Sequence, residues 1–137
     1  MPGWQGAIKT RVLLDTEAIC LAAIEGLAAL PKKIRGLLED VETDYILSSV
    51  SIMEIALKSG IGKLQMGEPE LRQAAHDLRL TIIPFTPRHA YGLFSLPLHH
   101  RDPFDRMLIA TALAEDMPLI GSDRQFKKYK GLKLIWQ

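Results

Sequence analysis

Residues 102–123 read DPFDRMLIATALAEDMPLIGSD, and this stretch encodes a helix followed directly by a short strand. Asp102 is a good N-cap, a proline suits the first helical turn, and apolar residues recur at helical spacing as far as Met117. The segment 118–123 then predicts an apolar strand that ends in an acid, Asp123.

The same order of apolar strand and helix recurs along the rest of the chain. A short apolar run at 12–14 ends in Asp15, and another at 45–47 is followed by serines that can cap a helix. The expected strands are 12–14, 45–47, 81–83, 118–123 and 132–136. The expected helices are 18–30, 31–42, a helix from the serines at 48–51 to residue 60, 71–78, 87–96 and 102–117.

This alternation predicts the fold class. Near-continuous apolar strands separated by helices are typical of a parallel sheet that is covered by helices on both faces. We therefore expect a three-layer α/β/α domain that spans residues 1–137 and has a mostly parallel sheet of about five strands. A chain of 137 residues buries a sufficient core without a disulfide or a structural metal.

Composition excludes several classes of protein. The 17 Lys and Arg balance 16 Asp and Glu, which argues against a protein that coats nucleic acid through bulk charge. A single cysteine, Cys20, excludes an internal disulfide and a cysteine-based zinc cage, and it fits a reducing compartment. The longest apolar run, 18–24, is too short to span a membrane. We expect a soluble, cytoplasmic protein without membrane association.

Four carboxylates are expected at one edge of the sheet. Asp15 and Asp123 each follow a strand, and Glu54 and Asp105 lie where the next helices begin. At a separation near 4 Å and an effective dielectric constant of 20, each pair repels by on the order of 4 kcal/mol, so the cluster needs protonation or a cation. Oxygen ligands without cysteine favour Mg²⁺ or Mn²⁺.

Helix capping is the structural alternative for each acid. Ser51 and Glu54 have the spacing of a capping box, and Asp15, Asp102 and Asp123 each precede a helix or turn. Capping alone does not require four acids at one edge of a sheet, so their joint placement favours a functional site.

Other classes of enzyme lack their motifs in this chain. There is no glycine-rich phosphate loop, no G-x-S-x-G turn and no Cys–His pair, and Asp15 is not followed by the second Asp of haloacid-dehalogenase-type phosphatases. His99 and His100 lie in a loop bounded by prolines. We expect them to anchor this loop rather than bind zinc, because no third ligand stands at a suitable spacing.

Four segments in this order resemble a PIN-domain ribonuclease, and they look like the VapC-type toxins of prokaryotic type II toxin–antitoxin modules. The segments are LLDT at 13–16, SSVSIMEIALK at 48–58, HHRDPFDR at 99–106 and SDRQF at 122–126. The resemblance extends over residues 11–136. It implies an endoribonuclease that depends on Mg²⁺ or Mn²⁺.

The resemblance also assigns roles to residues. It places Asp15, Glu54, Asp105 and Asp123 at the family's metal-binding positions, with Asp102 as an accessory acid, and a metal held there would activate a water for attack on the phosphate. By position, Thr16 is a candidate to support Asp15 through its hydroxyl. Arg106 and Arg124 are candidates to contact RNA phosphate, with a surface salt bridge as the alternative for each.

Two positions depart from the family pattern. Gly121 stands where the family often has Thr or Ser, which removes a hydroxyl next to Asp123 and bears on metal affinity. The helix after Asp15 lacks the aromatic residues that many relatives carry, which bears on the partner surface.

The resemblance further implies a cognate antitoxin and a homodimer. The apolar segment 18–30 would suit a groove for a partner helix, and a simply buried helix explains the same segment. Two other functions stay open. One is a catalytically silent PIN-fold module that binds RNA or protein, and the other is a metal-dependent DNA nuclease that uses the same crevice.

Overall fold

A computed structural model describes residues 10–136, which form a five-stranded parallel sheet with helices on both faces. The strands, in chain order, are β1 (Thr10–Leu14), β2 (Thr43–Ser48), β3 (Thr81–Ile83), β4 (Leu119–Ile120) and β5 (Leu134–Ile135). Their order in the sheet is β3-β2-β1-β4-β5, and every pair is parallel. The direction of winding therefore reverses at β1, which is where open α/β sheets place their functional crevice.

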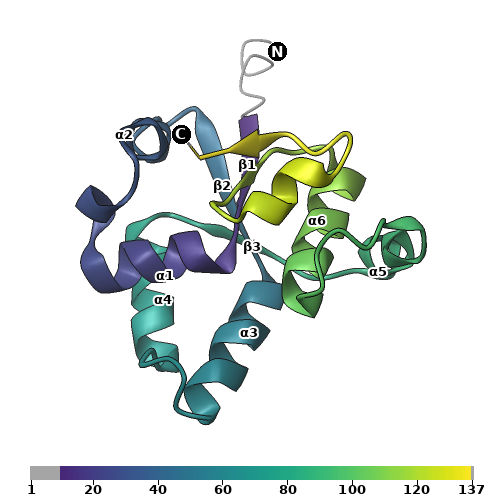
Figure 1. Cartoon of the computed structure of the whole chain (residues 1–137). Helices are drawn as coiled ribbons and strands as arrows, with labels where there is room; N and C mark the ends of the chain where they lie inside the picture. Colours follow the sequence, from purple (N-terminus) through teal and green to yellow (C-terminus); the bar gives the residue numbers. More distant parts are fainter. Residues whose placement is uncertain (1–9, 137) are drawn as a thin grey trace, which may run out of the picture.

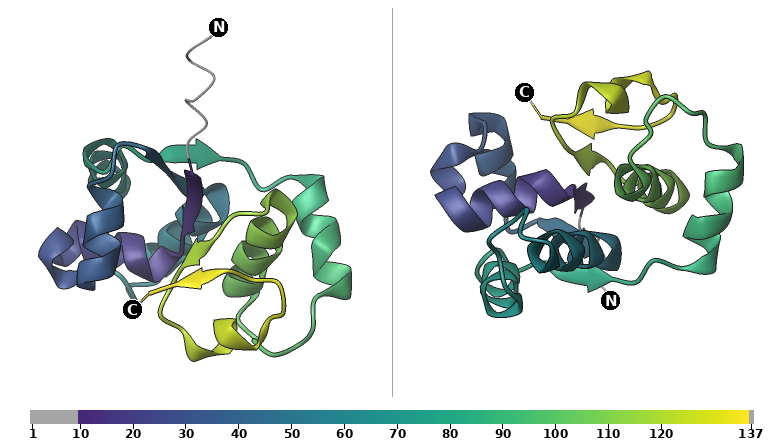
Figure 2. Two further views of the ribbon diagram at one scale, coloured as in Figure 1. Left: turned by 90° about the horizontal axis from the view of Figure 1, so that it is seen from above. Right: turned by 60° about the horizontal axis from the view of Figure 1, so that its bottom comes forward.

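Helices cover both faces of this sheet, as the three-layer prediction requires. They are α1 (Thr16–Glu25), α2 (Lys32–Leu38), α3 (Ser49–Gly60), α4 (Glu68–Asp77), α5 (Pro87–Tyr91) and α6 (Pro103–Glu115), with short 3-10 turns at Leu27–Ala29, Gly92–Ser95 and Arg124–Lys128. Figures 1 and 2 show α1 and α2 on one side of β1, and α5 and α6 on the other. The predicted fold class is confirmed.

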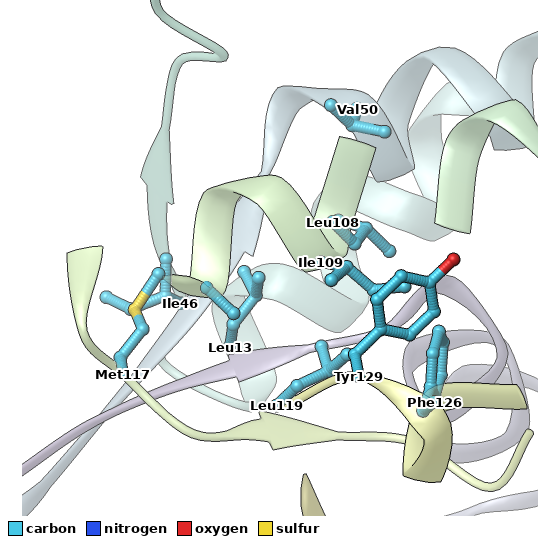
Figure 3. Close-up of a cluster of buried hydrophobic side chains, with 10 residues drawn as sticks. Leu13, Ile46, Val50, Leu108, Ile109, Met117, Leu119, Phe126 and Tyr129 are labelled. Carbon is cyan, nitrogen blue, oxygen red and sulfur yellow. The ribbon is translucent and has the colours of Figure 1, made fainter. Parts of the chain in front are cut away.

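Successive side chains along each strand point to opposite faces of the sheet, and this divides the hydrophobic core into two parts. Leu13, Ile46 and Leu119 pack against α6, where Leu108 and Ile109 are fully buried (Figure 3). The residues that alternate with them pack against α1 and α2, namely Val12, Leu14, Tyr45 and Ile120. Each fully buried aliphatic side chain stabilises the fold by roughly 1.5–3 kcal/mol relative to its exposed state. This packing fixes the strand ends from which the site is built.

Two of the expected helices end earlier than predicted. The helix expected at 18–30 ends at Glu25, because Gly26 adopts a positive φ of 88° and caps α1 through its backbone N–H. The helix expected at 31–42 covers only Lys32–Leu38, with Pro31 as its N-cap rather than in its first turn. The Asp40 carboxylate accepts the N–H of Glu42 and turns the chain toward β2.

Other boundaries also differ from the prediction. The helix expected at 87–96 is divided into α5 and the 3-10 turn Gly92–Ser95. The strands expected at 118–123 and 132–136 shorten to β4 and β5, each of two residues. The single domain expected over 1–137 includes residues 1–9 and 137, which lie outside the described residues, and it stays a prediction. Between residues 10 and 136, no helix is long and apolar enough to cross a membrane.

Candidate metal centre

An acidic cavity of about 220 Å³ lies at the carboxyl end of β1, at the point where the winding of the sheet reverses. It brings together the four predicted metal-binding acids and the two predicted accessory residues. Ten residues line this cavity: Asp15, Thr16, Glu17, Cys20, Glu54, Lys58, Leu64, Asp102, Asp105 and Asp123. The acids come from the end of β1, from α3, from the start of α6 and from the segment after β4. Parallel topology thus gathers side chains that are up to 108 positions apart, from Asp15 to Asp123.

Asp15 is the most enclosed of these acids, with 3% of its surface exposed. It is the N-cap of α1, and its Oδ1 accepts the backbone N–H of Ala18 at 2.7 Å. Burial raises the pKa of Asp15 to about 8, and the negative charges of Asp105, Glu17 and Glu54 act in the same direction. A carboxylate in this position is costly to ionise unless a cation lies beside it.

Glu54 presents an unpaired oxygen in the same cavity. Its Oε2 pairs with the ammonium of Lys58, one helical turn further along α3. Its Oε1 is buried and has no hydrogen-bond partner among residues 10–136. Buried carboxylate oxygens are normally satisfied, so this atom is a free ligand position in the cavity wall.

Asp102 and Asp105 occupy the first turn of α6. Asp102 is the N-cap, and its Oδ1 accepts the backbone N–H of Asp105 at 3.0 Å. The pKa of Asp105 is raised to about 7 by burial and by the neighbouring charge of Asp102, while His100 acts in the opposite direction. Asp105 therefore shares with Asp15 an environment that disfavours two bare carboxylates.

His100 joins two of the acids across the chain. Its Nε2 lies 2.9 Å from Oδ2 of Asp105 and 2.9 Å from Oδ2 of Asp123. The backbone N–H of Asp102 donates to His100 Nδ1 at 3.2 Å, so a neutral ring carries its proton on Nε2 and donates it toward the two carboxylates. The three side chains offer ligand atoms that all lie within 4.8 Å of one another.

The loop that carries His100 is held by the hydrophobic core. The hydroxyl of Tyr129, a member of the core cluster in Figure 3, accepts the backbone N–H groups of His99 at 3.2 Å and His100 at 2.8 Å. The expected anchoring role fits His99, whose ring packs edge-on against Tyr129. For His100 that expectation is incomplete, because the two acids beside its ring come from α6 and from the segment after β4.

Thr16 connects two helices of the site instead of supporting Asp15 directly. Its hydroxyl donates to the Ser51 Oγ at 2.9 Å, and both groups are buried, so the start of α1 is tied to α3. The capping box that was the structural alternative for Ser51 and Glu54 does not form, because Ser48 is the N-cap of α3. Glu54 is consequently left free to face the cavity.

The two arginines proposed for RNA differ in their surroundings. Arg106 donates to the backbone carbonyls of Leu96, Pro97 and His100, which fastens the same loop from the side of α6. Arg124 is exposed on the 3-10 turn that follows Asp123. Contact of either residue with RNA stays a prediction.

The structure gives a steric reason for a glycine at position 121. A Cβ at this position would lie 2.6 Å from Oδ2 of Asp15 and 2.6 Å from Cε2 of Phe126. Phe126 is buried in the core, and the carboxylate of Asp15 is held by the N–H of Ala18, so an added Cβ would have to shift one of them. The glycine therefore allows the carboxylate of Asp15 to lie against β4, where a larger residue would displace it.

The donor set fits a hard divalent cation. Carboxylate oxygens from four segments of the chain face one cavity, one of them is buried without a partner, and two of the acids have raised pKa values. Mg²⁺ and Mn²⁺ prefer such oxygen ligands, and a cation would replace the protons that burial otherwise favours.

Several residues of the cavity region were not predicted for this site, and two of them, Lys58 and His100, carry charge or a ligand atom beside its acids. Lys58 follows Glu54 by four residues, a spacing that places both on one face of a helix, and this signal was present in the sequence. His100 reaches the site through a loop held by long-range contacts to Tyr129, and no local pattern reveals that contact.

Comparison with known proteins supports the fold. The family model described as the PIN domain matches residues 12–132. VapBC2 from Rickettsia felis, bound to a DNA fragment from its promoter, is similar with a TM-score of 0.70 and 20% identity, covering 93% of this chain and 100% of that chain. DNA-bound VapBC from Salmonella typhimurium has a TM-score of 0.69 and 17% identity, covering 92% and 97%. FitAcB from Neisseria gonorrhoeae has a TM-score of 0.53 and 18% identity, covering 90% and 96%. No curated protein matches the chain.

Proposed function

Because the family model spans residues 12–132, the chain belongs to the PIN-domain family, and on this premise we propose that it is a metal-dependent endoribonuclease that acts as the toxin of a toxin–antitoxin pair. One observation carries the proposal. Four carboxylates from separate segments face a single cavity, and Oε1 of Glu54 is buried there without a partner among residues 10–136. Ionising these carboxylates together costs free energy unless a cation lies among them.

Asp15, Glu54, Asp105 and Asp123 are the residues that would hold Mg²⁺ or Mn²⁺. A bound ion of this kind lowers the pKa of a coordinated water and offsets charge on a phosphate. The chain's own contribution is to hold the ligands still. Asp15 is held by the N–H of Ala18 and by close packing against Gly121. The carboxylate of Asp123 is held by the N–H of Gln125, and Asp102 caps the helix that carries Asp105.

We further propose a cognate antitoxin as partner, RNA as substrate, a homodimer as the assembly and the cytoplasm as the location. The similar VapBC structures support the partner. A groove of about 550 Å³ between α1 and α4, lined in part by Ala22, Ala23 and Ala74, is the proposed seat of an antitoxin segment. The neighbouring Ala18 and Ile19 are buried in the core, so burial explains that part of the apolar segment.

Cleavage of total cellular RNA by the purified, partner-free protein tests this function. We expect discrete fragments with Mn²⁺ or Mg²⁺, none with EDTA, and none from Asp15→Asn. Asp116→Asn is the matched control, because that side chain is 88% exposed and lies outside the cavity, and this variant should cleave like the wild type.

Two outcomes would replace the proposal with an alternative. RNA that is bound but never cut, with every metal, would identify a silent binding module. Cleavage of single-stranded DNA in preference to RNA of matched sequence would identify a DNA nuclease.

A further inference from the structure

Lys58 stands at the mouth of the acidic cavity. It lies on α3, four residues after Glu54, and its ammonium pairs with Oε2 of that buried carboxylate. The side chain of Lys58 is 43% exposed, whereas that of Glu54 is 5% exposed. The ammonium therefore lies between the buried acid and the solvent from which a substrate would enter.

The charge of the cavity makes this cation distinctive. Six acids line the cavity, namely Asp15, Glu17, Glu54, Asp102, Asp105 and Asp123, and Lys58 is the one cation among its lining residues in the described part of the chain. The guanidinium of Arg106 is bound to backbone carbonyls, and Arg124 does not line the cavity. A phosphodiester that approaches these acids needs positive charge close to the point of entry.

We propose that Lys58 binds the scissile phosphate of the RNA at the mouth of this cavity, which makes it a further catalytic residue. This inference rests on the proposed ribonuclease function. An ammonium has three N–H donors, and its pairing with Glu54 leaves donors for a non-bridging phosphate oxygen. Glu54 thus fixes the position of the charge, and the charge attracts the substrate.

A purely structural ion pair is the competing explanation. The carboxylate of Glu54 is buried, so loss of its partner would leave an uncompensated charge in the cavity wall. That explanation predicts that removing the lysine lowers stability and leaves the affinity for RNA unchanged.

Binding of a labelled single-stranded RNA oligonucleotide of mixed sequence, measured over a range of salt concentrations, separates the two explanations. The variants are made in the Asp15→Asn background so that the RNA is not cut. We expect Lys58→Met to bind roughly tenfold more weakly and to lose about 0.7 from the slope of log K against log salt, as for one lost phosphate contact. Lys58→Arg should retain the slope because it retains the charge.

Lys63→Met is the matched control. Lys63 is exposed, follows the same helix and does not line the cavity, so this variant loses the same charge elsewhere. It should bind RNA like its parent, which separates a contact at the site from a general effect of net charge.

Three results would overturn the inference. An unchanged slope and affinity in Lys58→Met, while the wild type cleaves RNA with metal, would remove the role of Lys58 and leave the ribonuclease intact. A loss of Mn²⁺ affinity in Lys58→Met with Asp15 intact, measured by calorimetry, without a change in the RNA slope would make Lys58 a positioning residue for Glu54 instead. If the wild type neither binds nor cleaves RNA, the proposed function fails and this inference fails with it.

Discussion

Single acids in this protein perform two tasks with their two oxygens. Asp15, Asp102 and Asp123 each cap a helix or turn through Oδ1, and each also lines the cavity. Helix capping and a role in the site are therefore not exclusive explanations for these three acids. Sequence alone predicted which acids would meet, because the position of each relative to a strand or helix is a local property. It did not predict which oxygen each helix uses.

Gly121→Ala tests whether the glycine is needed for the position of Asp15. The added methyl would lie 2.6 Å from both Asp15 Oδ2 and the Phe126 ring, so we expect a loss of roughly 1–3 kcal/mol of stability together with weaker Mn²⁺ binding. Denaturant unfolding and calorimetry measure the two effects.

Gly36→Ala is the control for that substitution. Gly36 is exposed in α2 and a Cβ there meets nothing within 4 Å, so alanine should be neutral or stabilise by up to about 1 kcal/mol. Equal effects of the two substitutions would show that the close approach of Gly121 to Asp15 has no consequence.

Asp15→Asn is expected to stabilise the metal-free protein at alkaline pH. The folded state holds a proton on Asp15 up to about pH 8, whereas the unfolded chain releases it near 3.8, so the unfolding free energy of the wild type falls as pH rises between these values. Asparagine also caps helices but has no proton to lose. In EDTA, its Tm should exceed that of the wild type at pH 8, and the difference should shrink as the pH falls and disappear near pH 4.

Thermal unfolding over this pH range, with Asp116→Asn as the exposed control, measures the effect. Parallel Tm curves for Asp15→Asn and the wild type would show that Asp15 ionises freely in the folded protein.

At the level of elements, the sequence predicted well whether a segment forms a helix or a strand, and it predicted poorly the residues at which these elements end. All five strands and the helix at 103–115 are where periodicity placed them, because their apolar faces must be buried. The ends of α1 and α2 were wrong, because Gly26 and Asp40 terminate helical patterns whose apolar residues continue. The loop before α6 was beyond local prediction, because Tyr129 and Arg106 hold it from elsewhere in the fold.

Tyr129→Phe tests the coupling between the core and that loop. The buried hydroxyl accepts two backbone N–H groups, from His99 and His100, and its removal leaves both donors without this partner at a cost of roughly 1–3 kcal/mol. We expect a folded protein with weaker Mn²⁺ binding, because the ring of His100 contacts two of the acids.

Thermal unfolding and calorimetry on the same sample separate stability from metal affinity. Phe126 should not be used as the control, since its ring packs against Gly121. Tyr91→Phe serves instead, because Tyr91 is 71% exposed and does not line the cavity. If Tyr129→Phe binds Mn²⁺ as tightly as Tyr91→Phe, the loop is not positioned by this hydroxyl.

For the whole molecule, topology converts four short motifs into one site. The strand order β3-β2-β1-β4-β5 reverses direction at β1, and this brings the end of β1, the start of α6 and the segment after β4 to a single edge. Figure 2 shows these segments from two further directions. Fold class and the identity of the gathered acids follow from sequence, and the spacing of Lys58 from Glu54 was visible there as well. The position of His100 between two acids required the three-dimensional structure.

The central claim is that this acidic cavity binds a divalent cation through Asp15, Glu54, Asp105 and Asp123. Anomalous diffraction from crystals of the wild-type protein grown with Mn²⁺ tests it most directly. We predict a strong manganese peak inside the cavity, in contact with these carboxylates and with Oε1 of Glu54 among its ligands. Crystals saturated with Mn²⁺ that show no peak in the cavity, or peaks only at exposed surface acids, would contradict the claim.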